Sequence, residues 1–246
     1  DHEKRRGSGT VGARRPILQR AILKRTQDST HAWAVIPAKA LTEGKTRLST
    51  VLSPCERARL NREFLEHTLA VTTSTRGLAG VLLVSADPLA LALAREYGAR
   101  PIEEGSRRGL NPALTLASEW LARRGASHVM TVSADLPHLG ADDMNAVLTE
   151  ALLPSSAGSV TIAPDEEEQG TNVMVISPPG MIDYRYGLGS FIQHRSQCLA
   201  NGADFRIVRR PGLIFDVDSP EDLRRWKETV PSDAGHAAEA RACAAR

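Results

Sequence analysis

Short apolar runs alternate with longer amphipathic stretches between residues 32 and 230. The first apolar run, residues 33–36, predicts a strand, and Ser53-Pro54 precedes apolar positions at helical spacing from Leu60 to Val71. The other predicted strands cover residues 80–85, 100–102, 128–132, 160–163, 172–176, 205–208 and 213–216. Strands that alternate with helices indicate βαβ crossovers, so we expect an α/β fold with a mostly parallel central sheet flanked by helices.

Helix-capping residues mark the amphipathic stretches between these strands. The predicted helices run from Asp87-Pro88 to Gly98, from Leu110 to Gly125, from a cap near Asp142, from Ser190 to Asn201 and from Ser219-Pro220 to residue 230. Ser190 is the expected N-cap of its helix, because a serine side chain can accept a hydrogen bond from the first turn.

Length and charge divide the chain into one domain and two tails. The 246 residues are 41% apolar and 24% charged, which suits a single α/β domain, here residues 32–230. Residues 1–31 carry eight Lys or Arg against three Asp or Glu, a net charge of +5, and we expect a basic, disordered arm. Residues 231–246 are expected to be a frayed tail.

The distribution of charge also limits the partners. The whole chain has a formal charge of +2, so the part after the arm is net acidic, and no nucleic-acid partner is expected for it. No apolar run is long enough to span a bilayer, so no membrane partner is expected. Without a secretory-type apolar segment in residues 1–31 or a Cys-x-x-Cys pair, we expect a cytoplasmic protein. A homodimer is compatible with the sequence, although no residue indicates it.

Three aspartates are the main candidate for chemistry. Asp135, in Ser133-Ala134-Asp135-Leu136-Pro137, ends the buried strand 128–132, so its carboxylate should lie at the carboxyl edge of the sheet, where ligands bind. Asp216 and Asp218 form a second acidic pair. Carboxylates 4 Å apart would repel by about 4 kcal/mol at an effective dielectric of 20, so convergence of the three would favour Mg²⁺. The alternative is that Asp135 caps a turn and Asp218 caps the last helix.

Two basic residues follow the first strand. Lys39 and Arg47 could bind a triphosphate and the phosphate of an acceptor, Arg through two parallel hydrogen bonds and Lys as a point charge. A solvated basic loop is the alternative. Gly44-Lys45-Thr46 is similar to the end of a P-loop, but Lys39 stands where the first glycine of that motif belongs, so the motif is incomplete.

Two glycine-rich segments each contain a hydroxyl group. In Gly170-Thr171-Asn172 and Gly187-Leu188-Gly189-Ser190, glycines would let backbone N–H groups approach an anion, and Ser190 would lie at a helix N-terminus. Ordinary turns and a helix cap explain the same residues equally well. For His194, Tyr184 and Tyr186, packing roles are favoured over catalysis or stacking on a ligand.

These segments occur together, in this order, in a known family. The chain resembles the guanylyltransferases of coenzyme F-420 (deazaflavin) biosynthesis, which use 2-phospho-L-lactate, phosphoenolpyruvate or 3-phosphoglycerate. The resemblance covers residues 32–228, and it is the ordered set that is specific. The matching segments are Pro37-Ala38-Lys39, Lys45-Thr46-Arg47-Leu48-Ser49, Gly109-Leu110-Asn111-Pro112-Ala113, Ser133-Ala134-Asp135-Leu136-Pro137, Gly170-Thr171-Asn172, Tyr186-Gly187-Leu188-Gly189-Ser190-Phe191 with His194, and Asp216-Val217-Asp218-Ser219-Pro220-Glu221-Asp222-Leu223.

The resemblance implies a Rossmann-like nucleotidyltransferase fold of the glycosyltransferase-A type. It also implies roles for residues at the matching positions. Those that match Mg²⁺ ligands are Asp135, Asp216 and Asp218. Those that match residues around the phosphorylated acid are Lys39, Thr171, Gly187 and Ser190. Those that fall in the nucleotide-binding region are Arg47, Leu110 and Asn111.

The implied reaction is transfer of GMP from GTP to the phosphate of a three-carbon phosphorylated acid, with Lys39, Arg47 and Asp135 as catalytic residues. Two alternatives stay open. One is another nucleotidyltransferase of this fold, acting on a sugar phosphate or molybdopterin, although such enzymes usually carry a Gly-x-Gly-x-Arg loop that the first loop here lacks. The other is a non-enzymatic GTP-binding or nucleic-acid-binding protein that uses the basic arm.

Overall fold

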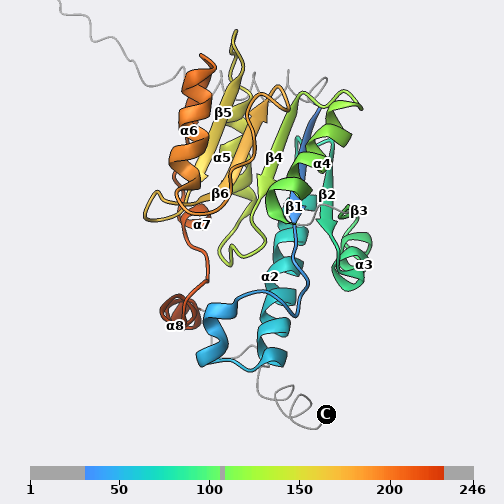
Figure 1. Cartoon of the computed structure of the whole chain (residues 1–246), viewed down its shortest axis with the longest axis vertical. Helices are drawn as coiled ribbons and strands as arrows, with labels where there is room; N and C mark the ends of the chain where they lie inside the picture. The colour runs from blue at the N-terminus through green and yellow to red at the C-terminus, as the bar shows by residue number, and fades with distance from the viewer. Residues whose placement is uncertain (1–30, 106–108, 230–246) are drawn as a thin grey trace, which may run out of the picture.

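The structure, a computed structural model, describes residues 31–105 and 109–229 (Figure 1). The strands are β1 (Ala32–Pro37), β2 (Gly80–Ser85), β3 (Arg100–Glu103), β4 (His128–Val132), β5 (Ser159–Pro164), β6 (Thr171–Ser177) and β7 (Asp204–Ile207). The helices are η1 (Thr46–Thr50), α2 (Pro54–Ser74), α3 (Pro88–Glu96), α4 (Leu110–Ala122), α5 (Ala141–Ala151), α6 (Ser190–Ala200), α7 (Pro211–Ile214) and α8 (Pro220–Thr229).

The described strands form one seven-stranded sheet in the order β3-β2-β1-β4-β6-β5-β7. The pairs β1–β2, β1–β4, β2–β3 and β5–β7 are parallel, whereas β6 runs antiparallel to both of its neighbours, β4 and β5. The expected α/β fold with a mostly parallel sheet is therefore confirmed. The reversed strand has a functional consequence, because the start of β6 lies beside the carboxyl end of β4.

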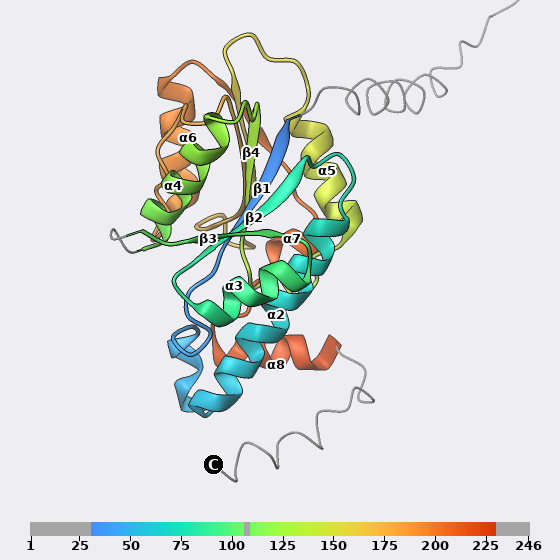
Figure 2. The same cartoon turned by 90° about the vertical axis from the view of Figure 1, so that its right-hand side faces the viewer.

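Helices cover both faces of the sheet (Figure 2). Successive side chains of a strand point to opposite faces, and in β1 Ala34 and Ile36 join one buried cluster while Val35 joins the other. The first cluster packs against α2, α3 and α5, and the second packs against α4 and α6. These runs are apolar on both faces, as expected for strands buried on both sides.

A third, smaller apolar cluster lies beyond the carboxyl edge of the sheet. It joins η1, α2 and α8, which Figure 1 draws below the sheet, and Phe64 meets Trp226 edge to face at 4.9 Å between ring centroids. Val217 is fully buried in this cluster. Its burial fixes the backbone between Asp216 and Asp218.

Two local predictions are wrong. Residues 213–216 do not form a strand, because α7 ends at Ile214 and an irregular segment follows. Pro211 favours a helical first turn, and the Asn172 side chain donates a hydrogen bond to Leu213 O at 2.9 Å. A short apolar run does not by itself distinguish a strand from a buried helical turn.

The second error concerns the start of α6. Gly189, with φ 66°, is the N-cap, and Ser190 is the first helical residue. The Ser190 hydroxyl makes no capping hydrogen bond and instead contacts Thr171. By contrast, the expected cap of the last helix is confirmed, because the Ser219 hydroxyl accepts from Asp222 N and the Asp222 carboxylate accepts from Ser219 N.

The predicted basic arm and C-terminal tail lie almost wholly outside the described residues, and they stay predictions. No helix in the described ranges combines the length and apolar character needed to cross a membrane.

The contact of α7 with α5 gives a test of this part of the fold. A Cβ added at Gly212 would lie 2.1 Å from Asp143 Oδ2 and 2.5 Å from the backbone O of His138. Asp143 is also held by Arg210 at 3.0 Å, so it cannot move away freely. Gly212→Ala should therefore lower the free energy of unfolding by about 1–3 kcal/mol in urea denaturation. Gly105→Ala, where nothing lies within 4 Å, is the matched control. Equal stability of the two variants would contradict the docking of α7.

Candidate active site

Three carboxylates converge at the carboxyl edge of the sheet. Asp135 follows β4, and Asp216 and Asp218 lie between α7 and α8. One carboxylate oxygen from each residue can be chosen so that all lie within 4.8 Å of one another. Asp135 and Asp216 are half-buried and Asp218 is exposed. The structure thus brings together the three side chains singled out from the sequence, although they are up to 83 positions apart in the chain.

The cluster is electrostatically costly for its most buried member. Burial, followed by the charges of Asp135 and Asp218, raises the pKa of Asp216 to about 7 from an ordinary value of 3.8. Asp216 is therefore partly protonated near neutral pH unless a cation offsets the charge. An oxygen-only ligand set of this kind fits a hard divalent cation such as Mg²⁺.

Lys45 is the cation that the protein itself supplies. Its Nζ lies 3.1 Å from Asp135 Oδ2 and 3.6 Å from Asp218 Oδ1, and it donates a hydrogen bond to Val217 O at 2.6 Å. Only 5% of its side chain is exposed, and the ammonium group lies 5.5 Å from the centre of the Phe64 ring. The sequence pattern gave this lysine no role. The available signal was its place in the matched segment that also contains Arg47.

The backbone of Lys45 is unusual as well. It has φ 54° and ψ 45°, in the left-handed region that residues with a side chain seldom occupy. Lys45 is the residue before η1, so this conformation turns the chain into η1 while the ammonium group reaches the aspartates. Backbone strain held in place by the surrounding structure is typical of functional sites.

Lys39 lies in the loop after β1 and Arg47 in the following η1, and both residues are exposed. Within the described ranges, neither side chain has a hydrogen bond or ion pair to the protein. The structure does not bring them into contact with Asp135. Both guanidinium and ammonium groups are therefore open to a ligand.

The two hydroxyl groups of the glycine-rich segments, those of Thr171 and Ser190, lie in contact with each other. Thr171 is the first residue of β6. The carbonyl of the next residue along the chain accepts a backbone hydrogen bond from Ser133 N, so the start of β6 lies beside the Asp135 segment. Ser190 Oγ lies 3.2 Å from Thr171 Oγ1, and both residues are buried. Gly187 joins them because its carbonyl accepts from Ser190 N at 3.1 Å.

The first-turn amides of α6 are partly used within the protein. Ser190 N donates to Gly187 O, and Phe191 N donates to Gln169 O at 3.2 Å. These two N–H groups are consequently not available to an anion. The hydroxyl pair of Thr171 and Ser190, rather than the start of the helix, is the main polar feature on this side of the site.

Asn111 holds the loop that leads into this pair. Its side-chain amide donates to Tyr186 O at 3.1 Å and accepts from Tyr186 N at 2.8 Å. Leu110, the preceding residue, is exposed. The Asn111 amide is thus engaged with the backbone, so a contact with a nucleotide would come from its main chain or from Leu110. Tyr184 is buried and the Tyr186 hydroxyl bonds that of Thr131, which agrees with packing roles.

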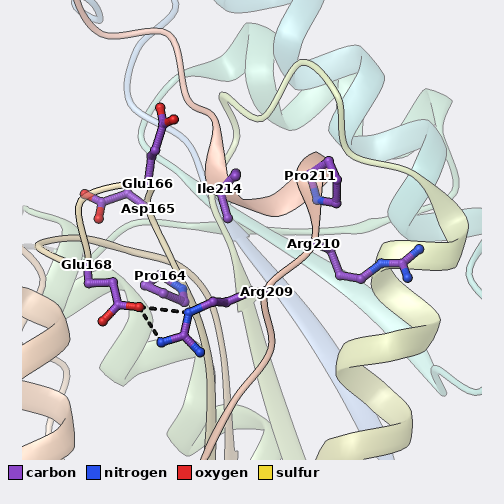
Figure 3. Close-up of a pocket in the computed structure, with 8 residues that line it drawn as sticks. All are labelled: Pro164, Asp165, Glu166, Glu168, Arg209, Arg210, Pro211 and Ile214. Atoms are coloured by element: carbon purple, nitrogen blue, oxygen red, sulfur yellow. Dashed lines mark hydrogen bonds and ion pairs between the residues drawn. The ribbon is translucent and has the colours of Figure 1, made fainter.

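A cavity of about 300 Å³ has Asp165 among its lining residues (Figure 3). It lies between the β5–β6 turn and the segment leading into α7, with Arg209 and Glu168 paired at one side. Arg210 instead points away toward α5, where it pairs with Asp143. The cavity is lined by Pro164, Asp165, Glu166, Glu168, Arg209, Arg210, Pro211 and Ile214. Asp165 also contributes to the raised pKa of Asp216, so the cavity and the aspartates share one electrostatic environment.

Similar solved structures define the class of fold. A putative nucleotide-diphospho-sugar transferase from Desulfovibrio desulfuricans G20 superposes with a TM-score of 0.66 at 14% identity, over 84% of this chain and 90% of that one. Glucosyl-3-phosphoglycerate synthase from Mycobacterium tuberculosis, solved with Mg²⁺ and uridine diphosphate, superposes with a TM-score of 0.59 at 11% identity. The superposition covers 83% of this chain and 77% of that one. The protein therefore has the Rossmann-like nucleotidyltransferase fold of the glycosyltransferase-A type, as expected.

Sequence comparison then gives the family. The family described as "Guanylyl transferase CofC like" matches residues 32–226, and the chain belongs to it. The protein is accordingly an enzyme, a nucleotidyltransferase of the guanylyltransferase kind. This excludes the non-enzymatic alternative.

Relatives named phosphoenolpyruvate guanylyltransferase align over most of the chain. The one from Sphaerobacter thermophilus is 37% identical over 201 residues, which cover 82% of this chain and 95% of the relative. The one from Rubrobacter xylanophilus is 38% identical over 194 residues, which cover 78% and 92%.

The position of Lys45 predicts a stability difference between two lysines of one loop. Lys45→Met keeps a long apolar stem but leaves the aspartates without their counter-charge. We expect the metal-free protein to lose about 1–3 kcal/mol of unfolding free energy at pH 7, less than for a fully buried pair because Asp135 and Asp218 are partly exposed. Lys39→Met, at an exposed position, should stay within about 0.5 kcal/mol of wild type. Equal losses would contradict the role of Lys45.

The raised pKa of Asp216 predicts a dependence of stability on pH. Folded Asp216 keeps its proton up to about pH 7, whereas the unfolded chain loses it near 3.8. Its contribution to the stability of the metal-free protein is therefore lost as pH rises through this window. Asp216→Asn removes the ionisation, so the variant should gain stability relative to wild type between pH 4 and pH 7 in urea titrations. Glu167→Gln, at an exposed acidic residue, is the control. A constant difference across these pH values would refute the assignment.

Proposed function

We propose that this enzyme transfers GMP from GTP to the phosphate of phosphoenolpyruvate and releases pyrophosphate, as a step of coenzyme F-420 biosynthesis. The names of the relatives support phosphoenolpyruvate over 3-phosphoglycerate and 2-phospho-L-lactate. The observation that carries the proposal is the convergence of three carboxylates, with the exposed side chains of Lys39 and Arg47 in the segment that follows β1. Both substrates are polyanions, and such a site offers the groups needed to hold them together.

The reaction is a single displacement at phosphorus. A phosphate oxygen of phosphoenolpyruvate forms a bond to the α-phosphorus of GTP, and the bond from that phosphorus to the bridging oxygen of the β-phosphate breaks. The electron pair leaves with pyrophosphate. The attacking oxygen is already anionic at pH 7, so no general base is required. Alignment of the two substrates can contribute roughly 7–11 kcal/mol.

The acidic residues suit Mg²⁺. Asp135, Asp216 and Asp218 would hold it through carboxylate oxygens, and the raised pKa of Asp216 is the mark of a cluster that favours a divalent cation. When bound, Mg²⁺ neutralises negative charge on the phosphate oxygens. Lys45 adds a positive charge on the same side and keeps the aspartates together.

The remaining residues bind and orient the substrates. Arg47 would hold the triphosphate through parallel hydrogen bonds, and Lys39 would hold the phosphate of the acid as a point charge. The Leu110-Asn111 backbone would border the nucleotide. On the acid side, the hydroxyl pair of Thr171 and Ser190 would donate a hydrogen bond to one of its oxygens, and Gly187 leaves room for a close approach. The groups assigned to the acid are Lys39, Thr171, Gly187 and Ser190.

A pyrophosphate-release assay tests the proposal. GTP and ATP are each combined with phosphoenolpyruvate, 3-phosphoglycerate and 2-phospho-L-lactate, with and without Mg²⁺. We expect release with GTP and phosphoenolpyruvate when Mg²⁺ is present, and little release in its absence. Preference for ATP or for another acid would correct the substrate. The absence of release with any pair would refute the proposed transfer.

A substitution at Asp135 separates chemistry from folding. Asp135→Asn keeps the size of the side chain and its contact with Lys45, but removes a charged metal ligand. Turnover should fall by at least about a hundredfold, since metal-ion stabilisation of transition-state charge contributes several kcal/mol. The circular dichroism spectrum and the gel-filtration volume should match those of wild type. Near-wild-type turnover would contradict the role of Asp135.

A further inference from the structure

A fully buried histidine lies behind the hydroxyl pair of Thr171 and Ser190. His194 is on α6, one turn after Ser190, and none of its surface is exposed. Both ring nitrogens are engaged: Nδ1 lies 3.1 Å from Thr171 Oγ1, and Nε2 lies 2.9 Å from Arg185 N. The Tyr186 ring packs edge-on against the His194 ring, with 5.1 Å between the ring centroids. The histidine therefore connects the loop before Gly187 to Thr171.

The contact with Arg185 decides which nitrogen carries the proton. A backbone N–H can only donate, so Nε2 of His194 must accept. Burial lowers the pKa of His194 to about 4, so the ring is neutral at pH 7 and carries one proton. That proton is consequently on Nδ1, and Nδ1 donates to Thr171 Oγ1.

Because Nδ1 donates, one hydroxyl proton of the Thr171–Ser190 pair has no acceptor among the residues that the structure describes. Thr171 and Ser190 have two hydroxyl protons, and their mutual hydrogen bond uses one of them. Within the described part of the chain, the only further side-chain partner of this pair is His194, which contacts Thr171 Oγ1 and not Ser190. Because His194 Nδ1 donates its own proton, Thr171 Oγ1 accepts it through a lone pair, and this contact uses neither of the two hydroxyl protons. The opposite tautomer would accept the second proton and leave none for a ligand.

We propose that His194 is a positioning residue that orients the Thr171–Ser190 pair so that it presents one O–H donor to an anionic oxygen of the phosphorylated acid. The proposal rests on the proposed function for the identity of that acid. His194 does not touch the substrate. It acts through Thr171, and through Arg185 it also fixes the loop that contains Gly187.

Two substitutions separate the two hydrogen bonds of the ring. In His194→Asn the side-chain amide can take the position of Nδ1 and still donate to Thr171, but nothing replaces Nε2. In His194→Gln the amide reaches the position of Nε2 and can accept from Arg185, but the donor to Thr171 is lost. Both variants lose the packing of the ring, so a purely structural histidine should be affected similarly by both.

We expect His194→Gln to raise KM for phosphoenolpyruvate about tenfold or more, with KM for GTP within twofold of wild type. His194→Asn should keep KM for phosphoenolpyruvate within about threefold. Adding His194→Gln to Thr171→Val should have no further effect on this KM, because the two residues act as one unit. Equal effects of Gln and Asn, an equal rise in KM for GTP, or additivity with Thr171→Val would overturn the proposal.

The tautomer is tested separately from turnover. Nitrogen-15 NMR of the wild-type protein at pH 7 should give a His194 ring protonated on Nδ1 alone. A ring protonated on Nε2, or on both nitrogens, would overturn the inference even if the enzyme transfers GMP to phosphoenolpyruvate. Failure of wild-type turnover would instead refute the proposed function, and the NMR measurement would still decide the tautomer.

Discussion

Repulsion between three carboxylates is the constraint on which the site depends. Separated along the chain, Asp135, Asp216 and Asp218 would stay apart in water, and the fold holds them within 4.8 Å. The burial of Val217 and the end of β4 fix their positions, while Lys45 supplies one positive charge to the three carboxyl groups. One ammonium group does not balance the cluster, so these residues would suit a divalent cation.

The second half of the site follows from the reversed strand. Because β6 is antiparallel to β4, its first residue lies at the same edge as the segment after β4, and Thr171 comes beside the Asp135 segment rather than at the far end of the sheet. Hydrogen bonds from α6 and from the loop before it then hold a hydroxyl pair in place. The antiparallel strand therefore brings a neutral polar pair to the edge of the sheet that also carries Asp135.

The sequence predicts those features that depend on local pattern. The apolar runs correctly predicted the strands of the sheet. The place of Asp135 after a strand predicted its position at the carboxyl edge of the sheet, and Ser219 predicted the N-terminal cap of α8. Prediction from the sequence failed where contacts between residues far apart in the chain determine the local structure. The apolar run at 213–216 begins with a helical turn because Asn172 binds Leu213 O and Asp143 holds Arg210, the residue before α7. Ser190 contacts Thr171 instead of capping its helix. Lys45 had no signal of its own, since its role appears only when the aspartates lie around it.

The most direct test of this account is an anomalous difference map from crystals grown with Mn²⁺, which has the same preference for oxygen ligands as Mg²⁺. We predict a peak at ligand distance from carboxylate oxygens of Asp135, Asp216 and Asp218, with the Lys45 ammonium group beside it. A map with no peak among these side chains, or with its peak at other residues of the enzyme, would contradict the account.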